Sequence, residues 1–457
     1  MSAPTPRSTR PTERPDAPSL IDAVLDPGTW QSWDPPGEPE SVLTGSGTVG
    51  GRRAVLVVSE FGFSGGSIGA AAGGRIVVAI RRATDDGLPV LALPASGGTR
   101  MQEGTPAFLQ MAAITAAVNE HRAAGLPYLV YLRHPTTGGV FASWGSLGDV
   151  GWAQPGALTG FLGPKVYQGI YREPFPAGVQ NSDNLHRLGF IDDVFPPVEL
   201  GARFGRVLAA LDATSEVTRS AVAGPLASPV DDAWAAVEAT RRDDRPGLVE
   251  LTAHLGAVPL AGAGPVRVGL ARLGGRPTIL VGQDRRVQAD GELISADALR
   301  VARRAVALAT RWRLPLVTVV DTSGGELSVA AEESGLARQI AHCTAELLAA
   351  PVPTASVLLG QGTGGAALAM FPADLRVAAT DAWLSPLPPE GASIIMHGDT
   401  EHAPQMAREQ QIWARELSEA GLVDVLADTL DDVVAALDAW AAADQAPDLG
   451  GRIRVGR

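Results

Sequence analysis

Residues 88–104 read LPVLALPASGGTRMQEG, and residues 126–143 read LPYLVYLRHPTTGGVFAS. In each stretch a short apolar run is followed by a Gly-Gly pair and then by residues that favour a helix. The same order returns later, where residues 314–335 read LPLVTVVDTSGGELSVAAEESG and residues 352–369 read VPTASVLLGQGTGGAALA. The sequence therefore predicts four copies of one unit, which consists of a strand, a Gly-Gly turn and a helix.

The spacing of these units indicates a duplication. The separation between Gly97 and Gly138 is nearly the same as the separation between Gly324 and Gly364. The later two turns thus follow the earlier two at an almost constant offset, if Gly97 is aligned with Gly324 and Gly138 with Gly364. We therefore expect two homologous halves of roughly 200 residues each, which is an ordinary domain size.

A Gly-Gly pair between a strand and a helix has a chemical use. Glycine lets the backbone approach a ligand closely, and the first amides of a helix have no acceptor within that helix. Together with the positive end of the helix dipole, these amides favour anions and developing oxyanions. A duplicated pair predicts a reaction in which two carbonyl-like groups gain negative charge, each facing its own backbone donors.

Composition narrows the classes of function. The 457 residues carry a formal net charge of −13, which argues against nucleic acid or an anionic membrane as the main partner. Lys165 is the only lysine, so a site for phosphate groups has to be built from arginine and backbone amides. The single cysteine, Cys343, excludes an internal disulfide and a four-cysteine zinc site. Its setting, IAHCTAELL, predicts a helical core position.

The distribution of residue types predicts the domain organisation. Residues 1–40 are rich in Pro, Thr, Ser and Arg, and we expect a disordered N-terminal extension there. We find no signal-peptide core and no apolar run long enough to span a membrane, so we expect a cytoplasmic protein. The expected parts after the extension are a β-type domain at 41–210, a linker with a helix around Trp234 at 211–247, an α-type domain at 248–445 and a tail at 446–457.

Apolar, β-branched segments alternate with Ala-rich helical segments within each half. AVLVVSEF (residues 54–61) and FLQMAAITAAVNEH (108–121) are examples from the first half, and TILVGQ (278–283) and LARQIAHCTAELLAA (336–350) are examples from the second. This alternation predicts an α/β fold with buried parallel strands. Such folds bind ligands at the carboxyl ends of their strands, where the Gly-Gly turns are expected.

Other motifs have simpler interpretations. Gly360–Gly365, GQGTGG, fits the dinucleotide pattern GxGxxG, but no acidic residue ends a following strand about 20 residues later. Gly45–Gly50 fits the same pattern, precedes a strand and is expected to be a turn. His397 and His402 flank an acidic pair without a third ligand at metal spacing, so we predict no metal site. If the motif SGGTRMQEG stood alone, Arg100 and Glu103 would indicate an ion pair on the surface of a capped helix. Because the motif has a copy at Ser323–Gly325, we favour a role in facing a ligand.

At these motifs the sequence resembles the carboxyltransferase component of biotin-dependent acyl-CoA carboxylases, with a β-type half followed by an α-type half. The first half is similar to the β pattern at EFGFSGGSIGAAAGGRI, SGGTRMQEG, PTTGGVFASWGSLGDV, and ALTGFLGPKV through REPFPAGVQNSDNLHRLGFID. The second half is similar to the α pattern at VDTSGGELSVAAEESG, GQGTGGAALAMFPADLRVA and SPLPPEGASII. The resemblance covers about residues 45–200 and 265–430.

The resemblance implies two homologous crotonase-like (ClpP/crotonase) ββα spiral domains. It also implies transfer of CO2 from carboxybiotin to the α-carbon of a short acyl-CoA, with acetyl-CoA giving malonyl-CoA in fatty acid biosynthesis as the favoured case. The acyl-CoA enolate and the biotin ureido anion are both oxyanions, which suits backbone donors. The implied catalytic residues are Gly138, Gly139, Gly364 and Gly365; those for substrate binding are Gly65, Gly66, Gly97, Gly98, Arg100 and Lys165; those on the biotin side are Gly324, Gly325, Gly362 and Ala366.

The resemblance also implies partners. The chain has no biotinylation motif and no ATP-grasp region, so biotin carboxyl carrier protein and biotin carboxylase are expected on separate chains. A homo-oligomer is expected because family sites form between halves of different protomers. Two alternatives stay open. The SGGELS segment departs from the α pattern and motivates a malonyl-CoA-type decarboxylase, and a non-catalytic homologue within a carboxylase complex is opposed by the intact Gly pairs.

Overall fold

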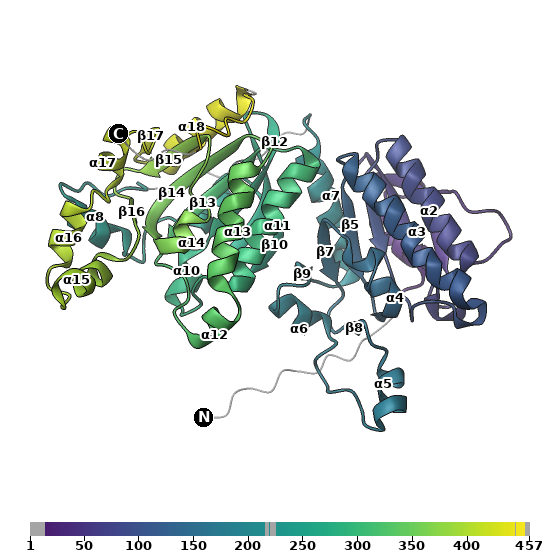
Figure 1. The fold of residues 1–457 in the computed structure, drawn as a ribbon. Coiled ribbons are helices and arrows are strands. Elements are labelled where there is room, and N and C mark those ends of the chain that lie inside the picture. The colour runs from purple at the N-terminus through teal and green to yellow at the C-terminus, as the bar shows by residue number, and fades with distance from the viewer. Residues whose placement is uncertain (1–13, 215–218, 220–224, 444, 453–457) are drawn as a thin grey trace. The chain divides into compact units, whose positions relative to one another are not determined.

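The computed structural model describes residues 14–214, 219, 225–443 and 445–452 (Figure 1). The chain divides into two compact units, Met1–Ala209 and Ala210–Arg457. Each unit has its own mostly parallel sheet with helices packed against it. The α/β fold class expected from the alternation of strands and helices is thus confirmed.

The first unit is built on a seven-stranded sheet of order β1-β2-β3-β4-β5-β7-β9. β2 pairs antiparallel with β1 and β3, and the strands from β3 to β9 run parallel. Its strands are β1 (Gln31–Ser32), β2 (Val42–Val49), β3 (Arg52–Ser59), β4 (Val90–Leu93), β5 (Tyr128–Leu132), β6 (Thr136–Thr137), β7 (Val150–Ala153), β8 (Thr159–Gly160) and β9 (Asp193–Val194). Its helices are α1 (Ala17–Val24), α2 (Ala70–Asp85), α3 (Gly104–Ala123), α4 (Gly138–Phe141), α5 (Pro164–Tyr171), α6 (Ser182–Arg187) and α7 (Leu200–Leu211).

The core of the first unit lies between its sheet and the helices α2 and α3, which run side by side in Figure 1. The central strands β3, β4 and β5 are buried along both faces, which explains their almost continuous apolar sequence. Ile76 and Ile80 on α2 and Ile114 and Val118 on α3 recur at helical spacing and are fully buried in one cluster.

The second unit repeats this plan with a sheet of order β10-β11-β12-β13-β14-β15-β17, while β16 pairs with β14. β11 is antiparallel to both neighbours, and the strands from β12 to β17 are parallel. Its strands are β10 (Val258–Ala263), β11 (Val266–Leu273), β12 (Arg276–Gln283), β13 (Leu316–Thr322), β14 (Thr354–Thr363), β15 (Leu375–Ala379), β16 (Trp383–Ser385) and β17 (Val425–Ala427). Its helices are α8 (Ala233–Thr240), α9 (Leu248–His254), α10 (Arg285–Ala289), α11 (Ala296–Trp312), α12 (Val329–Glu333), α13 (Leu336–Ala349), α14 (Gly364–Leu368), α15 (Pro389–His397), α16 (Ala403–Glu409), α17 (Ala414–Glu419) and α18 (Leu430–Ala442).

In this unit α11 and α13 pack together as α2 and α3 do in the first (Figure 1). Cys343 is buried within α13, as its setting predicts. Burial raises the pKa of its thiol to about 12, so it behaves as a small apolar side chain.

The two units correspond at a constant offset through the Gly-Gly turns. The isolated bridge between Ile68 and Thr99 in the first unit recurs between Ile294 and Gly325 in the second, with the same sequence offset at both positions. Gly98 therefore corresponds to Gly324, and the alignment of Gly97 with Gly324 was wrong by one position. A Gly-Gly pair offers two equivalent registers to sequence comparison, and only the backbone pairing selects one.

The N-terminal segment differs from the expected disordered extension. Residues 1–13 lie outside the described residues, but Ala17–Val24 form α1. Leu20, Ile21 and Val24 are buried at helical spacing, and Asp16 caps the helix by accepting from the Ser19 N–H. The surrounding Pro and Ser residues concealed this short amphipathic pattern.

Two further expectations, one for Gly45–Gly50 and one for the linker, can be compared with the structure. Gly45 lies inside β2, paired with Leu56 of β3, so that stretch is mainly strand and the turn comes at its end, at Gly50 and Gly51. The helix expected around Trp234 is α8. Residues 215–218 and 220–224 of the expected linker lie outside the described residues.

Candidate functional site

The first Gly-Gly turn follows β4 and lies against the start of α4. Gly98 has a φ of 115°, and its N–H donates to Ser96 Oγ at 3.0 Å. A bridge between Ser96 and Thr136 joins the turn to the residues that lead into α4. A Cβ on Gly98 would lie 3.7 Å from Gly138 Cα and 3.7 Å from Gly139 N. The fold thus brings together the two Gly pairs of the first half.

The start of α4 presents amides to this place. Gly138 has a φ of 63°, but its N–H donates to the Phe161 carbonyl at 3.1 Å and is already used. Gly139 and Val140 supply the next amides of the helix, and first-turn amides have no acceptor within their own helix. Gly139 is therefore the better-placed donor of the pair.

Gly65 and Gly66 pack against the same turn. The Gly97 N–H donates to the Gly65 carbonyl at 3.1 Å. A Cβ on Gly66 would fall 2.0 Å from the Ala95 carbonyl oxygen, which is far inside the contact distance of non-bonded carbon and oxygen atoms. The close backbone contact leaves no space for a side chain at position 66. Gly66 therefore influences a ligand indirectly, by allowing the turn to take its position.

Arg100 lies in an internal ion network. Its Nη1 lies 2.6 Å from Glu40 Oε1 and 3.0 Å from Glu103 Oε1, and Nη2 donates to the Ser67 carbonyl at 3.0 Å. Its side chain is 13% exposed. Burial opposes the ionised form of Glu40, but the hydrogen bonds and charge of Arg100, together with hydrogen bonds from Ser41, outweigh it and lower the pKa of Glu40. In this arrangement Arg100 holds the turn in place, and its donors are engaged by protein groups.

Lys165 is the second residue of α5, which follows the Gly160 strand end. Its side chain lies outside what the structure describes. A contact between Lys165 and a ligand stays a prediction.

The second half repeats the turn geometry. Gly324 has a φ of 131°, and its N–H donates to Thr322 Oγ1 at 3.1 Å, as Gly98 does to Ser96. Gly364, with a φ of 65°, begins α14 and corresponds to Gly138. The Thr363 hydroxyl at this helix start is buried and has no hydrogen-bond partner among the described residues. A buried donor without a partner at a helix start is suited to a polar ligand atom.

The remaining residues expected on the biotin side surround this helix start. A Cβ on Gly325 would lie 3.2 Å from Leu336 Cδ2, and a Cβ on Gly362 would lie 2.7 Å from Leu384 Cδ1. Ala366 is buried, and its carbonyl accepts from Gln283 Nε2 at 2.8 Å. Gly362 and Ala366 therefore serve packing in this structure, and their contact with biotin stays a prediction.

Asp321 is a charged residue of this site that the sequence analysis did not single out. It precedes the second Gly-Gly turn, and its Oδ1 accepts from the Gln361 N–H at 3.1 Å. Burial raises its pKa to about 6, against the opposing charges of Arg285 and Arg245 and the hydrogen bond from Gln361. Its place at the end of an apolar strand was the available signal, because a charged residue there faces the carboxyl edge of the sheet.

Arg245, whose charge acts on Asp321, forms an ion pair with a second buried carboxylate, Asp381. Its Nη1 lies 2.5 Å from Asp381 Oδ2, and its Nη2 donates to the Leu359 carbonyl at 2.5 Å. Arg285 Nε lies 3.8 Å from Asp321 Oδ2. These residues are distant in sequence, so no local pattern predicts their pairing.

No group of three or more His, Cys, Asp or Glu side chains within the described ranges is arranged to hold a metal ion. Within the same residues, no helix combines the length and apolarity needed to cross a bilayer.

The two halves share a crotonase-like fold, and each has a glycine turn against a helix start, which is the arrangement expected of an acyl carboxyltransferase. A model of the carboxyl transferase domain matches residues 36–186 and 262–437. The chain belongs to this family.

Named relatives place the chain more closely. It is 50% identical over 436 residues to the probable biotin-dependent acyl-coenzyme A carboxylase beta3 subunit of Mycobacterium tuberculosis (strain ATCC 25618 / H37Rv), covering 89% of this chain and 88% of the relative. It is 37% identical over 421 residues to the acetyl-coenzyme A carboxylase carboxyl transferase subunits beta/alpha of Salinispora tropica, covering 85% and 73%. The crystal structure of transcarboxylase 12S superposes with a TM-score of 0.78 at 21% identity, covering 95% of this chain and 91% of that one, and supports the fold.

Proposed function

We propose that this chain is the carboxyltransferase of a biotin-dependent acyl-CoA carboxylase. The observation that carries the proposal is the duplicated helix start, at Gly138 and Gly364, each beside a glycine turn of the same geometry. Two such places suit a reaction between two partners that both develop negative charge on oxygen.

The first half is proposed to hold the thioester of the acyl-CoA. The Gly139 amide, with Val140 beside it in α4, donates to the thioester oxygen and stabilises the negative charge that this oxygen carries in the enolate. Loss of one such donor typically costs about 3 kcal/mol of transition-state stabilisation. Gly98 and Gly138 let the turn and the helix start approach each other closely, because neither has a side chain between them.

The second half is proposed to hold biotin, and its residues fit a polar carbonyl group. The Thr363 hydroxyl has no partner among the described residues, and Gly365 lies in the first turn of α14. When bound, carboxylated biotin supplies the carboxyl group that is transferred. Thr363 and Gly365 would orient its carbonyl oxygen, while Gly324 leaves the approach open.

Acetyl-CoA, converted to malonyl-CoA for fatty acid biosynthesis, is the proposed substrate. Support comes from the name of the Salinispora tropica relative, and the Mycobacterium relative carries the broader acyl-CoA name. Biotin is proposed to arrive on a carrier protein, with biotin carboxylase on a further chain.

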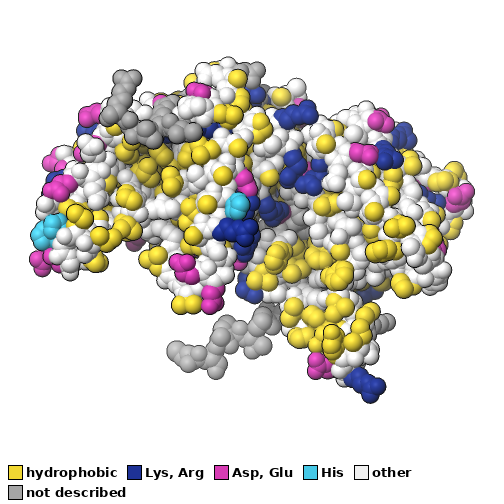
Figure 2. Space-filling view, viewed as in Figure 1, with side chains coloured by type: hydrophobic (Ala, Val, Ile, Leu, Met, Phe, Trp, Pro, Cys, Tyr) yellow, Lys and Arg dark blue, Asp and Glu magenta, His cyan; other side chains and the backbone are white. Residues whose placement is uncertain are grey.

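A homo-oligomer is proposed as the working form. Figure 2 shows hydrophobic side chains gathered over α5. Phe161, Val166, Ile170 and Tyr171 in this segment are each more than half exposed. A contiguous apolar surface of this kind favours a protein–protein contact.

The test is to run the reaction in reverse, with malonyl-CoA and free biocytin, and to follow acetyl-CoA formation. Turnover that requires biocytin is the expected result. Turnover without biocytin would favour the malonyl-CoA decarboxylase alternative, and no turnover of malonyl-CoA or methylmalonyl-CoA would contradict the proposal.

Matched glycine variants assign the two helix starts. Gly139→Val and Gly365→Val should each reduce turnover at least about a hundredfold, since each obstructs one set of donors. A Cβ on Gly139 would lie 3.3 Å from Met111 Cγ, and a Cβ on Gly365 would lie 2.8 Å from Ile340 Cδ1, so both variants need a neighbouring side chain to move. Gly74→Val, on the exposed side of α2, is the control because a Cβ there meets no atom within 4 Å. Full activity in a folded Gly139→Val protein would refute the assigned donor.

A further inference from the structure

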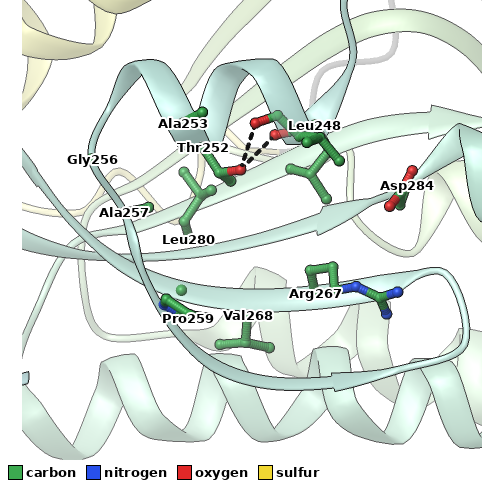
Figure 3. Close-up of a pocket in the computed structure, with 12 residues that line it drawn as sticks. Leu248, Thr252, Ala253, Gly256, Ala257, Pro259, Arg267, Val268, Leu280 and Asp284 are labelled. Atoms are coloured by element: carbon green, nitrogen blue, oxygen red, sulfur yellow. Dashed lines mark hydrogen bonds between the residues drawn. The ribbon is translucent and has the colours of Figure 1, made fainter. Parts of the chain in front are cut away.

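A cavity of about 360 Å³ lies in the second unit between α9 and the three antiparallel strands β10, β11 and β12 (Figure 3). This volume is in the range of small-molecule pockets, about 300–1,000 Å³. Most of its lining is apolar and includes Leu248, Ala257, Val268 and Leu280. Figure 3 shows Ala257 at one end of the pocket, with Arg267 and Asp284 toward the other.

The duplication identifies the corresponding place in the first unit. Gln31 pairs with Ser46 in the first unit, and Val258 pairs with Leu270 in the second. In the next pair along each ladder, the partner residue on β2 or β11 is a glycine in both units. The two pairs are Ser32 with Gly45, and Pro259 with Gly269. By this register β1 corresponds to β10, and the residue before each strand corresponds as well.

Those preceding residues are Trp30 in the first unit and Ala257 in the second. The Trp30 ring covers Gly45, because a Cβ there would lie 2.6 Å from Cη2 of the indole. A Cβ on Gly269 would instead lie 3.6 Å from the Ala257 Cβ. The second unit therefore has a methyl group where the first has an indole, and the pocket lies at this place.

An apolar pocket of this kind loses packing contacts when nothing fills it and takes up apolar molecules of matching shape. The first unit shows which shape fits, since an indole lies over the equivalent glycine. Asp284 is engaged at the start of α10, where its Oδ1 accepts from the Arg286 N–H at 3.0 Å. Arg267 is exposed at the mouth, and among the described residues its guanidinium is bonded through Nη1 to backbone carbonyls, which leaves three of its five donors for a ligand.

We infer that this pocket binds a small planar apolar molecule of about the size of indole, with an acidic group directed to Arg267. The aromatic body occupies the space beside Ala257 and Gly269 that Trp30 fills in the first unit. The acidic group reaches the guanidinium at the open end, where water screens the pair and makes its contribution modest.

The experiment titrates the full-length protein with indole-3-propionate and with indole, followed by ligand-detected NMR. One saturable site per chain is expected for both. Arg267→Ala should weaken indole-3-propionate about twofold to fivefold and leave indole unchanged. The absence of saturable binding by either probe would overturn the inference, and equal effects of Arg267→Ala on both probes would overturn the role of Arg267.

Reciprocal variants locate the site. Ala257→Trp should abolish binding and should not lower the melting temperature, because the new indole fills the pocket. Ala253→Phe, placed on α9 at the same pocket, is the second variant if Ala257→Trp fails to fold. Trp30→Ala should add a second indole site in the first unit. Binding that persists in both folded filling variants would refute the location.

Discussion

Two adjacent glycines show how a single atom can decide whether the first turn forms. Gly65 and Gly66 have almost the same φ, 64° and 66°. A Cβ on Gly65 meets nothing within 4 Å, whereas a Cβ on Gly66 would fall 2.0 Å from the Ala95 carbonyl oxygen. The two positions therefore separate backbone strain from steric exclusion.

We expect Gly65→Ala to lower the free energy of unfolding by about 1–2 kcal/mol, the cost of a left-handed conformation for alanine. Gly66→Ala should cost about 3 kcal/mol or more, because the displaced backbone adds an overpacking cost of about 1–3 kcal/mol. Urea unfolding of both variants checks this difference. Equal losses would show that strain alone limits these positions.

Asp321 is expected to make stability depend on pH. Burial raises its pKa from 3.8 to about 6, so the folded protein binds this proton more tightly than the unfolded chain. Its contribution is then fully present below pH 4 and is lost as pH rises through about 6. From pH 7 to pH 5 the wild type should gain about 1 kcal/mol that Asp321→Asn does not gain. Urea unfolding at pH 5, 6 and 7 measures this, and parallel pH profiles would contradict it.

At the scale of elements, the C-terminal segment ties down the end of α13. Arg452 is fully buried, and its Nη1 donates to the carbonyls of Leu347 at 3.0 Å and Ala350 at 2.9 Å. Its Nε lies 2.7 Å from Asp374 Oδ1. One guanidinium thus satisfies carbonyls that a helix end leaves without partners and neutralises a carboxylate.

Arg452→Met should therefore lower the free energy of unfolding by about 3–5 kcal/mol, because it removes one member of a buried, hydrogen-bonded ion pair. Arg286→Met is the matched control, since the Arg286–Glu250 pair is exposed and should contribute less than about 1 kcal/mol. Adding Asp374→Asn to Arg452→Met should recover part of the loss. Similar losses for Arg452→Met and Arg286→Met would contradict a larger contribution from the buried Arg452–Asp374 pair.

For the whole molecule, the division into two units predicts how unfolding proceeds. Each unit has its own sheet and its own buried core. We expect calorimetry to resolve two transitions, because separate cores unfold with their own cooperativity. Gly66→Ala should lower only the transition of residues 1–209, and Arg452→Met only that of residues 210–457. A joint shift of both transitions would show that the units unfold as one.

The sequence by itself determined the duplication, the α/β class and the placement of glycine turns between strands and helices. These features are local, because apolar periodicity and Gly-Gly pairs report on neighbouring residues. It also led to the family, through long motifs in the right order. The short helix α1 was missed because eight residues in a Pro-rich context give a weak periodic signal.

Only the tertiary structure decided which of the candidate groups are already engaged. The Gly138 N–H is taken by the Phe161 carbonyl, and Arg100 by Glu40, which is remote from it in sequence. Asp321 Oδ1 likewise accepts from the remote Gln361 N–H, and Arg285 Nε lies 3.8 Å from its Oδ2. Hydrogen-bond partners depend on distances between residues remote in the chain, and a local pattern contains no such distances.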